Sequence, residues 1–204
     1  MIDNEVKLDK KLNINTRGVI DWPLGVNLEY FRTESTLYSD LEHLTREYDL
    51  LADANLVDFG SGKGRVIYYF NYQLKIKTTA LEINNKSYRE LMHNFKSYKE
   101  KYPQESKNIS IYKEKAEDYQ IKDDENIFYF FNPFTVKIFK EIIENIKQSL
   151  KENPRVIDII IYYPSLNYTH YLDKQEGFHF IQLIKTAKYD INSRECFKVY
   201  RYHP

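Results

Sequence analysis

Asn55-Leu-Val-Asp-Phe-Gly-Ser-Gly-Lys-Gly-Arg65 is the stretch of sequence that decides the fold of this chain. Its first five residues predict a buried strand with Asp58 near its end, and a helix is expected from Arg65 onward. The three glycines between them permit positive φ angles and a close approach of the backbone to a ligand. Because the first amides of the helix point at the same turn, the stretch predicts a ligand cradle at the carboxyl end of a parallel strand.

The spacing of the glycines distinguishes between the known kinds of nucleotide-binding loop. A dinucleotide-binding loop has the pattern Gly-x-Gly-x-x-Gly, whose third glycine would fall on Arg65. A P-loop ends in Gly-Lys-Ser/Thr, but here Lys63 is followed by Gly64. The pattern that remains, Asp-x-Gly-x-Gly-x-Gly, resembles the first motif of the class I S-adenosylmethionine-dependent methyltransferases. The alternative interpretation is a glycine turn that binds no ligand.

Composition limits the class of protein. The 204 residues suffice for one domain with a sizeable core. The 30 basic and 30 acidic side chains give a formal net charge of zero, whereas nucleic-acid-binding proteins are usually basic. Cys196 is the only cysteine and the five histidines lack metal-ligand spacing, so neither a disulfide nor a metal is expected. Without an apolar spanning segment or a visible signal peptide, no membrane partner and a cytoplasmic location are expected.

Apolar strands alternate with amphipathic helices from residue 54 onward, which is typical of a doubly wound α/β sheet. The last two strands are joined by a short polar loop, which favours an antiparallel pair. The sequence therefore predicts a mostly parallel, seven-stranded, Rossmann-like sheet with an antiparallel C-terminal strand. The expected strands are 55–59, 78–83, 109–112, 127–131, 156–163, 178–186 and 196–202, and the expected helices are 65–73, 85–101 and 135–151.

The first 50 residues precede this sheet. Leucines and a tyrosine at helical spacing predict a helix over 36–51, with Ser35 or Thr36 as its N-cap. Residues 1–34 are expected to form a lid on the carboxyl edge of the sheet. We therefore expect a dependent N-terminal extension, 1–50, and a ligand-binding domain, 51–204.

Polar residues follow three further predicted strands, where ligands of open α/β sheets bind. Glu82 ends the second strand, and a carboxylate there is suited to accept the hydroxyl protons of a ribose. After the third strand, the methyltransferase resemblance implies that Glu117 or Asp118 contacts an adenine edge; either is also a plausible cap for a turn.

Asn132-Pro133-Phe134 follows the fourth strand. An asparagine both donates and accepts hydrogen bonds, and a proline stiffens the turn, which suits a site where a methyl group is transferred. The alternative is that Asn132 caps the next helix and Pro133 is its first residue.

The segments LVDFGSGKGR, ALEI, KAED and FNPF together resemble a narrower group, the small methyltransferases related to the histone-lysine methyltransferase that disrupts telomeric silencing. In that comparison Arg32–Thr36 would match a Tyr-Gly-Glu-Thr segment, which implies that Glu34 and Thr36 face the amino-acid end of the cofactor. The chain departs from the pattern because the Tyr-Gly pair is absent and Pro133 replaces a second asparagine.

The resemblance implies a methyltransferase that uses S-adenosylmethionine, with S-adenosylhomocysteine as product. Its acceptor, a small molecule or a protein, is unidentified, and an amine is one candidate. The alternatives are a non-catalytic S-adenosylmethionine-binding regulator and a nucleic-acid amino methyltransferase, which the one-residue departure from Asn/Asp-Pro-Pro-Tyr/Phe and the zero net charge disfavour. No oligomeric state is predicted. The expected catalytic residues are Asn132, Pro133 and Phe134, and the expected cofactor-binding residues are Glu34, Thr36, Asp58, Gly60, Ser61, Gly62, Gly64, Glu82, Glu117, Asp118 and Asn132.

Overall fold

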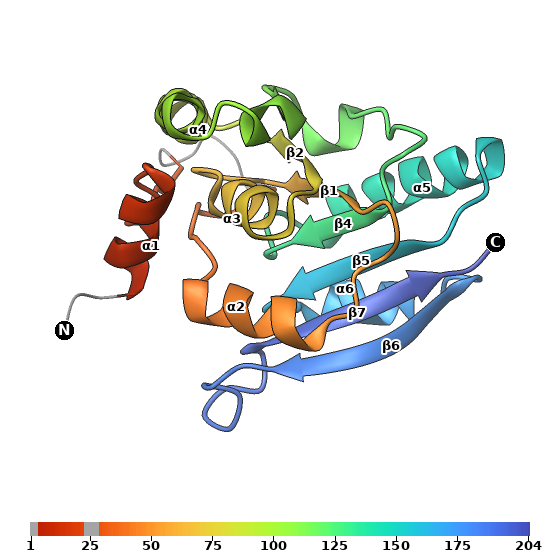
Figure 1. Cartoon of the computed structure of the whole chain (residues 1–204). Coiled ribbons are helices and arrows are strands. Elements are labelled where there is room, and N and C mark those ends of the chain that lie inside the picture. Colours follow the sequence, from red (N-terminus) through yellow and green to blue (C-terminus); the bar gives the residue numbers. More distant parts are fainter. Residues whose placement is uncertain (1–3, 23–28) are drawn as a thin grey trace.

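A seven-stranded sheet forms the centre of the computed structural model, which describes residues 4–22 and 29–204 (Figure 1). Its strand order is β3-β2-β1-β4-β5-β7-β6, with neighbours parallel from β3 to β5 and β7 antiparallel to both β5 and β6. This confirms the predicted sheet. The strands are β1 (Asn55–Phe59), β2 (Lys77–Leu81), β3 (Ile109–Tyr112), β4 (Ile127–Phe130), β5 (Ile157–Tyr162), β6 (Phe178–Lys185) and β7 (Cys196–Tyr202).

The second strand ends earlier than the predicted 78–83. The carbonyl oxygen of Leu81 accepts hydrogen bonds from the amides of Gly60 and Ser61, at 3.0 and 2.9 Å. Because the glycine turn takes this carbonyl, regular pairing stops there and Glu82 lies just beyond the strand.

Helices cover both faces of the sheet. α2 and α3, with α1 and α4 beside them, share one apolar core with the sheet, and α5 and α6 share the other. Their bounds are α1 (Asn4–Leu12), α2 (Tyr38–Glu47), α3 (Arg65–Leu74), α4 (Asn85–Lys101), α5 (Val136–Glu152) and α6 (Leu166–Leu172), with short 3-10 turns η1 (Glu105–Asn108) and η2 (Ala116–Asp118). Within the described residues, no helix is long and apolar enough to cross a membrane.

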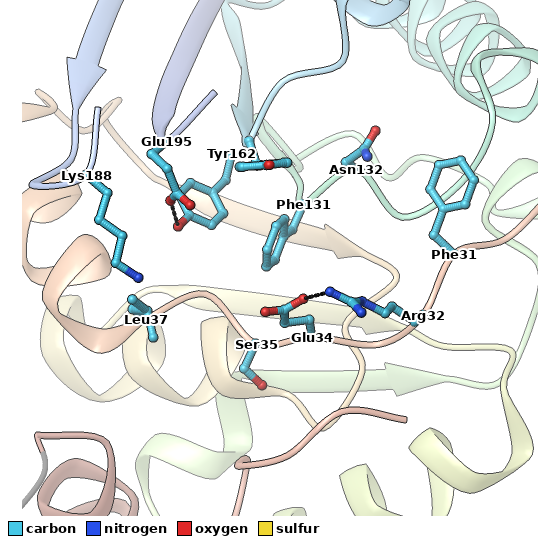
Figure 2. A pocket seen from close by; sticks show the side chains of 11 residues that line it. Phe31, Arg32, Glu34, Ser35, Leu37, Phe131, Asn132, Tyr162, Lys188 and Glu195 are labelled. Carbon is cyan, nitrogen blue, oxygen red and sulfur yellow. Dashed lines mark hydrogen bonds and ion pairs between the residues drawn. The ribbon is translucent and has the colours of Figure 1, made fainter. Parts of the chain in front are cut away.

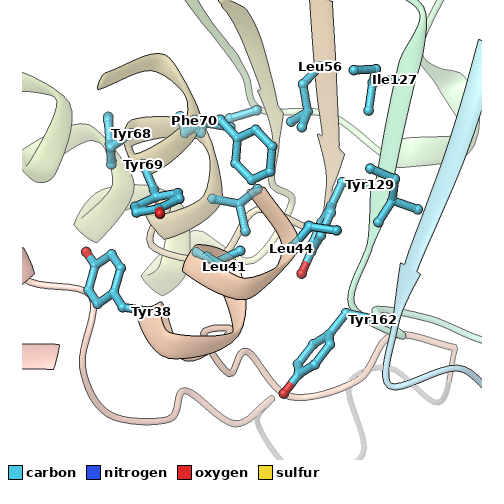
Figure 3. Close-up of a cluster of buried hydrophobic side chains, with 14 of the residues drawn as sticks. Tyr38, Leu41, Leu44, Leu56, Tyr68, Tyr69, Phe70, Ile127, Tyr129 and Tyr162 are labelled. Carbon is cyan, nitrogen blue, oxygen red and sulfur yellow. The ribbon is translucent and has the colours of Figure 1, made fainter. Parts of the chain in front are cut away.

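Side chains of the central strands alternate between these two cores, as the pleat requires. Leu56 and Tyr129 point to the core under α2 and α3 (Figure 3), whereas Val57 and Phe128 belong to the core under α5. Since both faces are covered, β1 is buried along its whole length. Asp58, on the same face as Leu56, is therefore a carboxylate set into a buried strand.

The predicted helix 36–51 is shorter than expected, and its predicted cap is wrong. The N-cap residue is Leu37, with no side-chain hydrogen bond. Ser35 instead donates from Oγ to the carbonyl of Thr16 (2.8 Å), and the hydroxyl of Thr36 bonds the hydroxyl of Tyr129 (2.7 Å). Both hydroxyls are engaged in tertiary contacts, so neither reaches the free amides of the helix.

The N-terminal region packs against the sheet domain through the buried guanidinium of Arg65. This group donates to Thr16 Oγ1 (2.7 Å) and to the carbonyl of Thr36 (3.0 Å), pairs with Glu5 and lies over the ring of Tyr38. These contacts bind α1, the chain at Thr16 and the start of α2 to α3.

Only part of the predicted lid lies on the carboxyl edge of the sheet. Residues 29–34 do, whereas α1 packs in the core with α2, α3 and α4 (Figure 1). Residues 1–3 and 23–28 of the predicted lid lie outside the described part of the chain.

Gly64 is required by both backbone conformation and space. Its φ is +88°, and a Cβ there would lie 2.5 Å from Leu91 Cδ1 and 2.6 Å from Tyr68 Cε2. Gly64→Ala should lower the free energy of unfolding by about 2–4 kcal/mol in urea denaturation, because strain and overpacking add. Gly18→Ala is the matched control, with φ of +79° but only Lys63 Nζ at 3.8 Å, and should cost about 1–2 kcal/mol. Equal losses in the two variants would contradict the packing at Gly64.

Candidate functional site

The glycine turn after β1 is fastened to the end of β2. Besides the two backbone bonds to Leu81, the hydroxyl of Ser61 donates to the carbonyl of Asp58 (2.7 Å) and accepts from the amide of Leu81 (3.1 Å). Ser61, a predicted ligand contact, therefore uses its hydroxyl to hold the turn. The turn is a rigid platform across the carboxyl ends of β1 and β2.

Glu82 lies beside this turn and is 5% exposed. Its carboxylate accepts hydrogen bonds from the amides of Gly62 (2.8 Å) and Asn84 (2.6 Å). Burial raises the pKa of Glu82 to about 7, even though the Asn84 and Gly62 hydrogen bonds lower it. Glu82, the residue predicted to bind a ribose, is thus held in place by the amide of Gly62 in the glycine turn.

Asp58 is a second buried carboxylate, 3% exposed. Burial and then the neighbouring charge of Glu82 raise the pKa of Asp58 to about 8. Within residues 4–22 and 29–204, neither carboxylate forms an ion pair with a basic side chain. Two acids without a counter-charge suit a ligand that brings hydroxyl donors and positive charge.

A short segment, residues 29–34, crosses this edge of the sheet and is called the strap below. The amide of Phe31 donates to the carbonyl of Pro133 (2.9 Å), and the amide of Thr135 donates to the carbonyl of Glu29 (2.7 Å). Tyr30 forms an antiparallel bridge with Phe134. The strap therefore pairs with the turn that follows β4.

Tyr30 fastens the strap on the side of η2. Its hydroxyl donates to Glu117 Oε2 at 2.6 Å, and its ring contacts Trp22 and Phe134, with centroids 5.8 and 6.0 Å away. Burial and then the hydrogen bond to Glu117 raise the pKa of Tyr30. The strap is held from both sides of the cleft beneath it.

This cleft, lined by the strap, the glycine turn, Glu82, Glu114 and Pro133, encloses about 40 Å³. A Cβ on Gly60 would lie 2.6 Å from Pro133 Cβ, and one on Gly62 would lie 2.4 Å from Thr33 Cγ2. Both glycines thus allow neighbouring chain to approach the turn. In this conformation the cleft has room for about one water molecule.

A larger cavity of about 430 Å³ adjoins the cleft (Figure 2). The two share Phe31, Arg32, Glu34 and Phe131 as lining residues. The cavity extends along the ends of β4 and β5 and is completed by the 188–195 loop. Its remaining lining residues are Ser35, Leu37, Asn132, Tyr162, Tyr163, Lys188 and Glu195.

Two residues of the cavity adopt left-handed backbone conformations. Asn132 has φ of +43° and Tyr163 has φ of +51°, at the carboxyl ends of β4 and β5. Such conformations cost about 1–3 kcal/mol for residues other than glycine and concentrate at functional sites. The backbone turns sharply at both residues, at the edge of the cavity.

The structure places the three residues predicted to be catalytic in two neighbouring spaces. Asn132 lines the cavity, whereas Pro133 and Phe134 line the cleft, and the carbonyl of Phe134 accepts from the hydroxyl of Tyr168 at 2.5 Å. The alternative prediction for this turn is wrong, because α5 begins at Val136 with Thr135 as N-cap. The strap occupies the turn, which pushes the helix start three residues further on.

The predicted cofactor contacts upstream and after β3 also separate. Glu34 lines both hollows and pairs with Arg32 at 3.1 Å, whereas Thr36 is 1% exposed and faces Tyr129. Glu117 holds Tyr30, and Asp118 lines a different surface hollow beside Tyr112.

Sequence reasoning missed several lining residues. Tyr162 and Tyr163 end an apolar strand, and the strand-end rule that found Glu82 would have found them. Tyr30 and Glu195 reach the site through long-range loop packing and carry no local signal.

The fold is that of known methyltransferases. No protein-family model and no curated protein sequence matches the chain. Among solved structures, a human methyltransferase 10 domain containing protein matches with a TM-score of 0.63 and 13% identity over 98% of this chain and 93% of that one. The N-terminal domain of human METTL16, in complex with SAH, matches with 0.57 and 12% over 98% and 79%.

The glycopeptide N-methyltransferase MtfA, complexed with S-adenosylmethionine, matches with a TM-score of 0.61 and 9% identity over 81% of this chain and 87% of that one. At these identities the likeness establishes the Rossmann-like methyltransferase fold alone.

The unpaired acid in β1 makes stability depend on pH. The pKa of Asp58 is raised in the folded protein to about 8, so the stability that its protonated form contributes is complete below pH 4 and is lost as pH rises through 8. Asp58→Asn should therefore melt higher than the unmodified protein at pH 8.5, by the equivalent of a few kcal/mol, with the difference shrinking toward pH 5. Thermal unfolding followed by circular dichroism measures this. Asp190→Asn, at an exposed acid, should show no such trend, and parallel profiles for both variants would contradict the burial argument.

Proposed function

We propose that this chain binds S-adenosylmethionine at the glycine turn and transfers its methyl group to an acceptor in the adjoining cavity. The observation that carries the proposal is the pair of buried carboxylates, Asp58 and Glu82, which lack a basic partner among the described residues. S-adenosylmethionine brings ribose hydroxyls, an ammonium group and a sulfonium to such a site. The likeness to structures described with this cofactor or its product supports the same ligand.

The residues of the turn fit the parts of this cofactor. Glu82 would accept the ribose hydroxyls, and Asp58 would face the cationic amino-acid end, through water where needed. Glu34 is a second acceptor at that end, since it lines the cleft. Glu117, Asp118 and Glu114 are the candidates for the adenine edge, of which Glu114 lines the cleft.

The strap must move for this ligand to enter. A nucleoside needs several times the 40 Å³ that the closed cleft offers. The contacts that open are the backbone bonds to Pro133 and Thr135 and the Tyr30 hydroxyl bond to Glu117. Because Glu117 is itself a candidate adenine contact, Tyr30 competes with the ligand for it.

The chemistry requires alignment more than activation. The cofactor supplies an electrophilic methyl group, so the protein has to hold the acceptor in line with it. Asn132 lines the acceptor cavity, beside the Phe131 wall that the cavity shares with the cleft. Its amide orients the acceptor atom by donating or accepting a hydrogen bond.

Under the same proposal the chain is related to the silencing-related methyltransferases and divides at residue 50. The proposed location is cytoplasmic, which the free thiol of buried Cys196 favours. A non-catalytic regulator would bind the cofactor but would form no S-adenosylhomocysteine, and this distinguishes it from an enzyme.

Titration of S-adenosylmethionine in a calorimeter tests the proposal. Binding should release protons and tighten from pH 6 to 8, because a cation beside Asp58 lowers its raised pKa. Glu82→Gln should weaken binding about 10- to 100-fold, since a hydrogen bond to a charged group is lost. Glu176→Gln, at an exposed acid before β6, is the control. No heat at any pH, or equal binding by both variants, would refute the assignment.

Loosening the strap should favour the cofactor. Tyr30→Phe removes a hydrogen bond of about 1 kcal/mol that exists only in the closed form, so S-adenosylmethionine should bind about two- to tenfold more tightly. Tyr102→Phe, which removes a remote hydroxyl bond to the carbonyl of Lys11, should leave affinity unchanged. Weaker binding by Tyr30→Phe would mean that Tyr30 contacts the cofactor directly.

A further inference from the structure

Two carboxylates converge on one phenol at the end of β5. The hydroxyl of Tyr162 lies 2.8 Å from Asp40 Oδ2 and 3.1 Å from Glu195 Oε2 (Figure 2 draws the second contact). Tyr162 and Asp40 are 3% and 6% exposed, and Glu195 lines the 430 Å³ cavity. Burial and then the charge of Asp40 raise the pKa of Tyr162, so this phenol stays protonated.

A phenol has a single proton to donate, so one of these carboxylates receives none from it. Asp40 is the nearer acceptor and lies in the first turn of α2, where the helix dipole stabilises a negative charge. It therefore takes the Tyr162 proton. Glu195 is left facing the cavity without that donor, and among the described residues it forms no ion pair with a basic side chain.

The basic side chains near Glu195 contact other groups or solvent. Arg32 pairs with Glu34 at 3.1 Å, and the guanidinium of Arg194 lies over the ring of Tyr163 at 4.1 Å. Lys188 is exposed, and no ion pair joins it to Glu195 in Figure 2. Glu195 is therefore a cavity carboxylate outside any ion pair among the described residues, and Lys188 lines the same cavity without pairing with it.

Aromatic rings line the same cavity as this carboxylate. Phe131 meets Tyr162 edge-on, with centroids 4.6 Å apart, and Tyr163 with centroids 6.5 Å apart. A carboxylate beside aromatic side chains attracts an organic ammonium group through charge and cation–π contact. A neutral hydroxyl or nucleobase brings no charge that could pair with the carboxylate of Glu195.

We infer that the acceptor is an aliphatic primary amine that enters this cavity as its ammonium ion and binds Glu195; the inference rests on the proposed methyl transfer. Glu195 then takes one proton from the ammonium, which gives a neutral amine and a carboxylic acid. The nitrogen lone pair forms the new N–C bond as the C–S bond breaks. The sulfur keeps the electron pair of the C–S bond and leaves as a neutral thioether, and the product is the methylated ammonium ion. Asn132 orients the nitrogen.

Binding and transfer are measured separately to test this. n-Hexylamine should bind at least tenfold more tightly than n-hexanol in calorimetry with S-adenosylhomocysteine present, because only the amine carries charge. Labelled methyl transfer from S-adenosylmethionine should go to hexylamine and Nα-acetyl-lysine amide, and not to adenosine, single-stranded RNA or catechol.

Glu195→Gln should raise the KM for hexylamine at least tenfold while the affinity for S-adenosylmethionine changes less than twofold. Glu176→Gln is the matched control. Glu176 lies just before β6. The first residue of β6 and the first residue of β5 both pair with Tyr202, so Glu176 is near the amino end of β5, on the edge of the sheet opposite to Glu195.

The possible failures are distinguishable. If S-adenosylmethionine does not bind, the proposed function fails and the inference with it. If the cofactor binds but methyl groups go only to a nucleobase or a hydroxyl, or to no acceptor in the panel, the amine inference alone is wrong. Equal binding of hexylamine and hexanol, a measurement that needs no variant, would also overturn it.

Discussion

The structure depends on two carboxylates that are buried at the ends of neighbouring strands without a counter-charge. Isolated buried charges are costly, and the chain offsets part of the cost with backbone amides. Gly62 and Asn84 supply those amides to Glu82, which requires the glycine turn to bend back over β2. Asp58 has no comparable support, and its raised pKa reflects this. The turn is thus built to hold negative charge where a ligand is expected.

The strap lies at the same edge of the sheet as the buried carboxylates. It crosses the edge of the sheet beside Glu82, and its residues line both the cleft and the cavity. One segment therefore forms a wall of both spaces, and under the proposed function binding in the cleft would change the wall of the cavity. Arg65 and its contacts to Thr16 and Thr36 anchor the chain on either side of the strap to α3.

The sheet and its turn could be predicted from sequence because their signals are local. β4 is a continuous apolar run, β1 is an apolar stretch interrupted by Asp58, and the glycine spacing marks the loop between strand and helix. The turn after β4 was harder to predict. Asn132-Pro133 has the chemistry of a helix start, but pairing with the strap, a contact between distant residues, holds it in a different conformation. Glu195 was missed for the same reason, since only the packing of a distal loop brings it to Tyr162.

The central claim is that the buried carboxylates bind a cationic nucleoside. The pKa of Asp58, measured with and without that ligand, tests it most directly. Carbon-13 NMR of the aspartate carboxyl groups, assigned by comparison with Asp58→Asn, gives the pKa of this group with and without S-adenosylmethionine. The account predicts a pKa near 8 in the free protein, and a fall of at least one unit when the ligand is bound. An ordinary pKa in the free protein, or one that the ligand leaves unchanged, would contradict it.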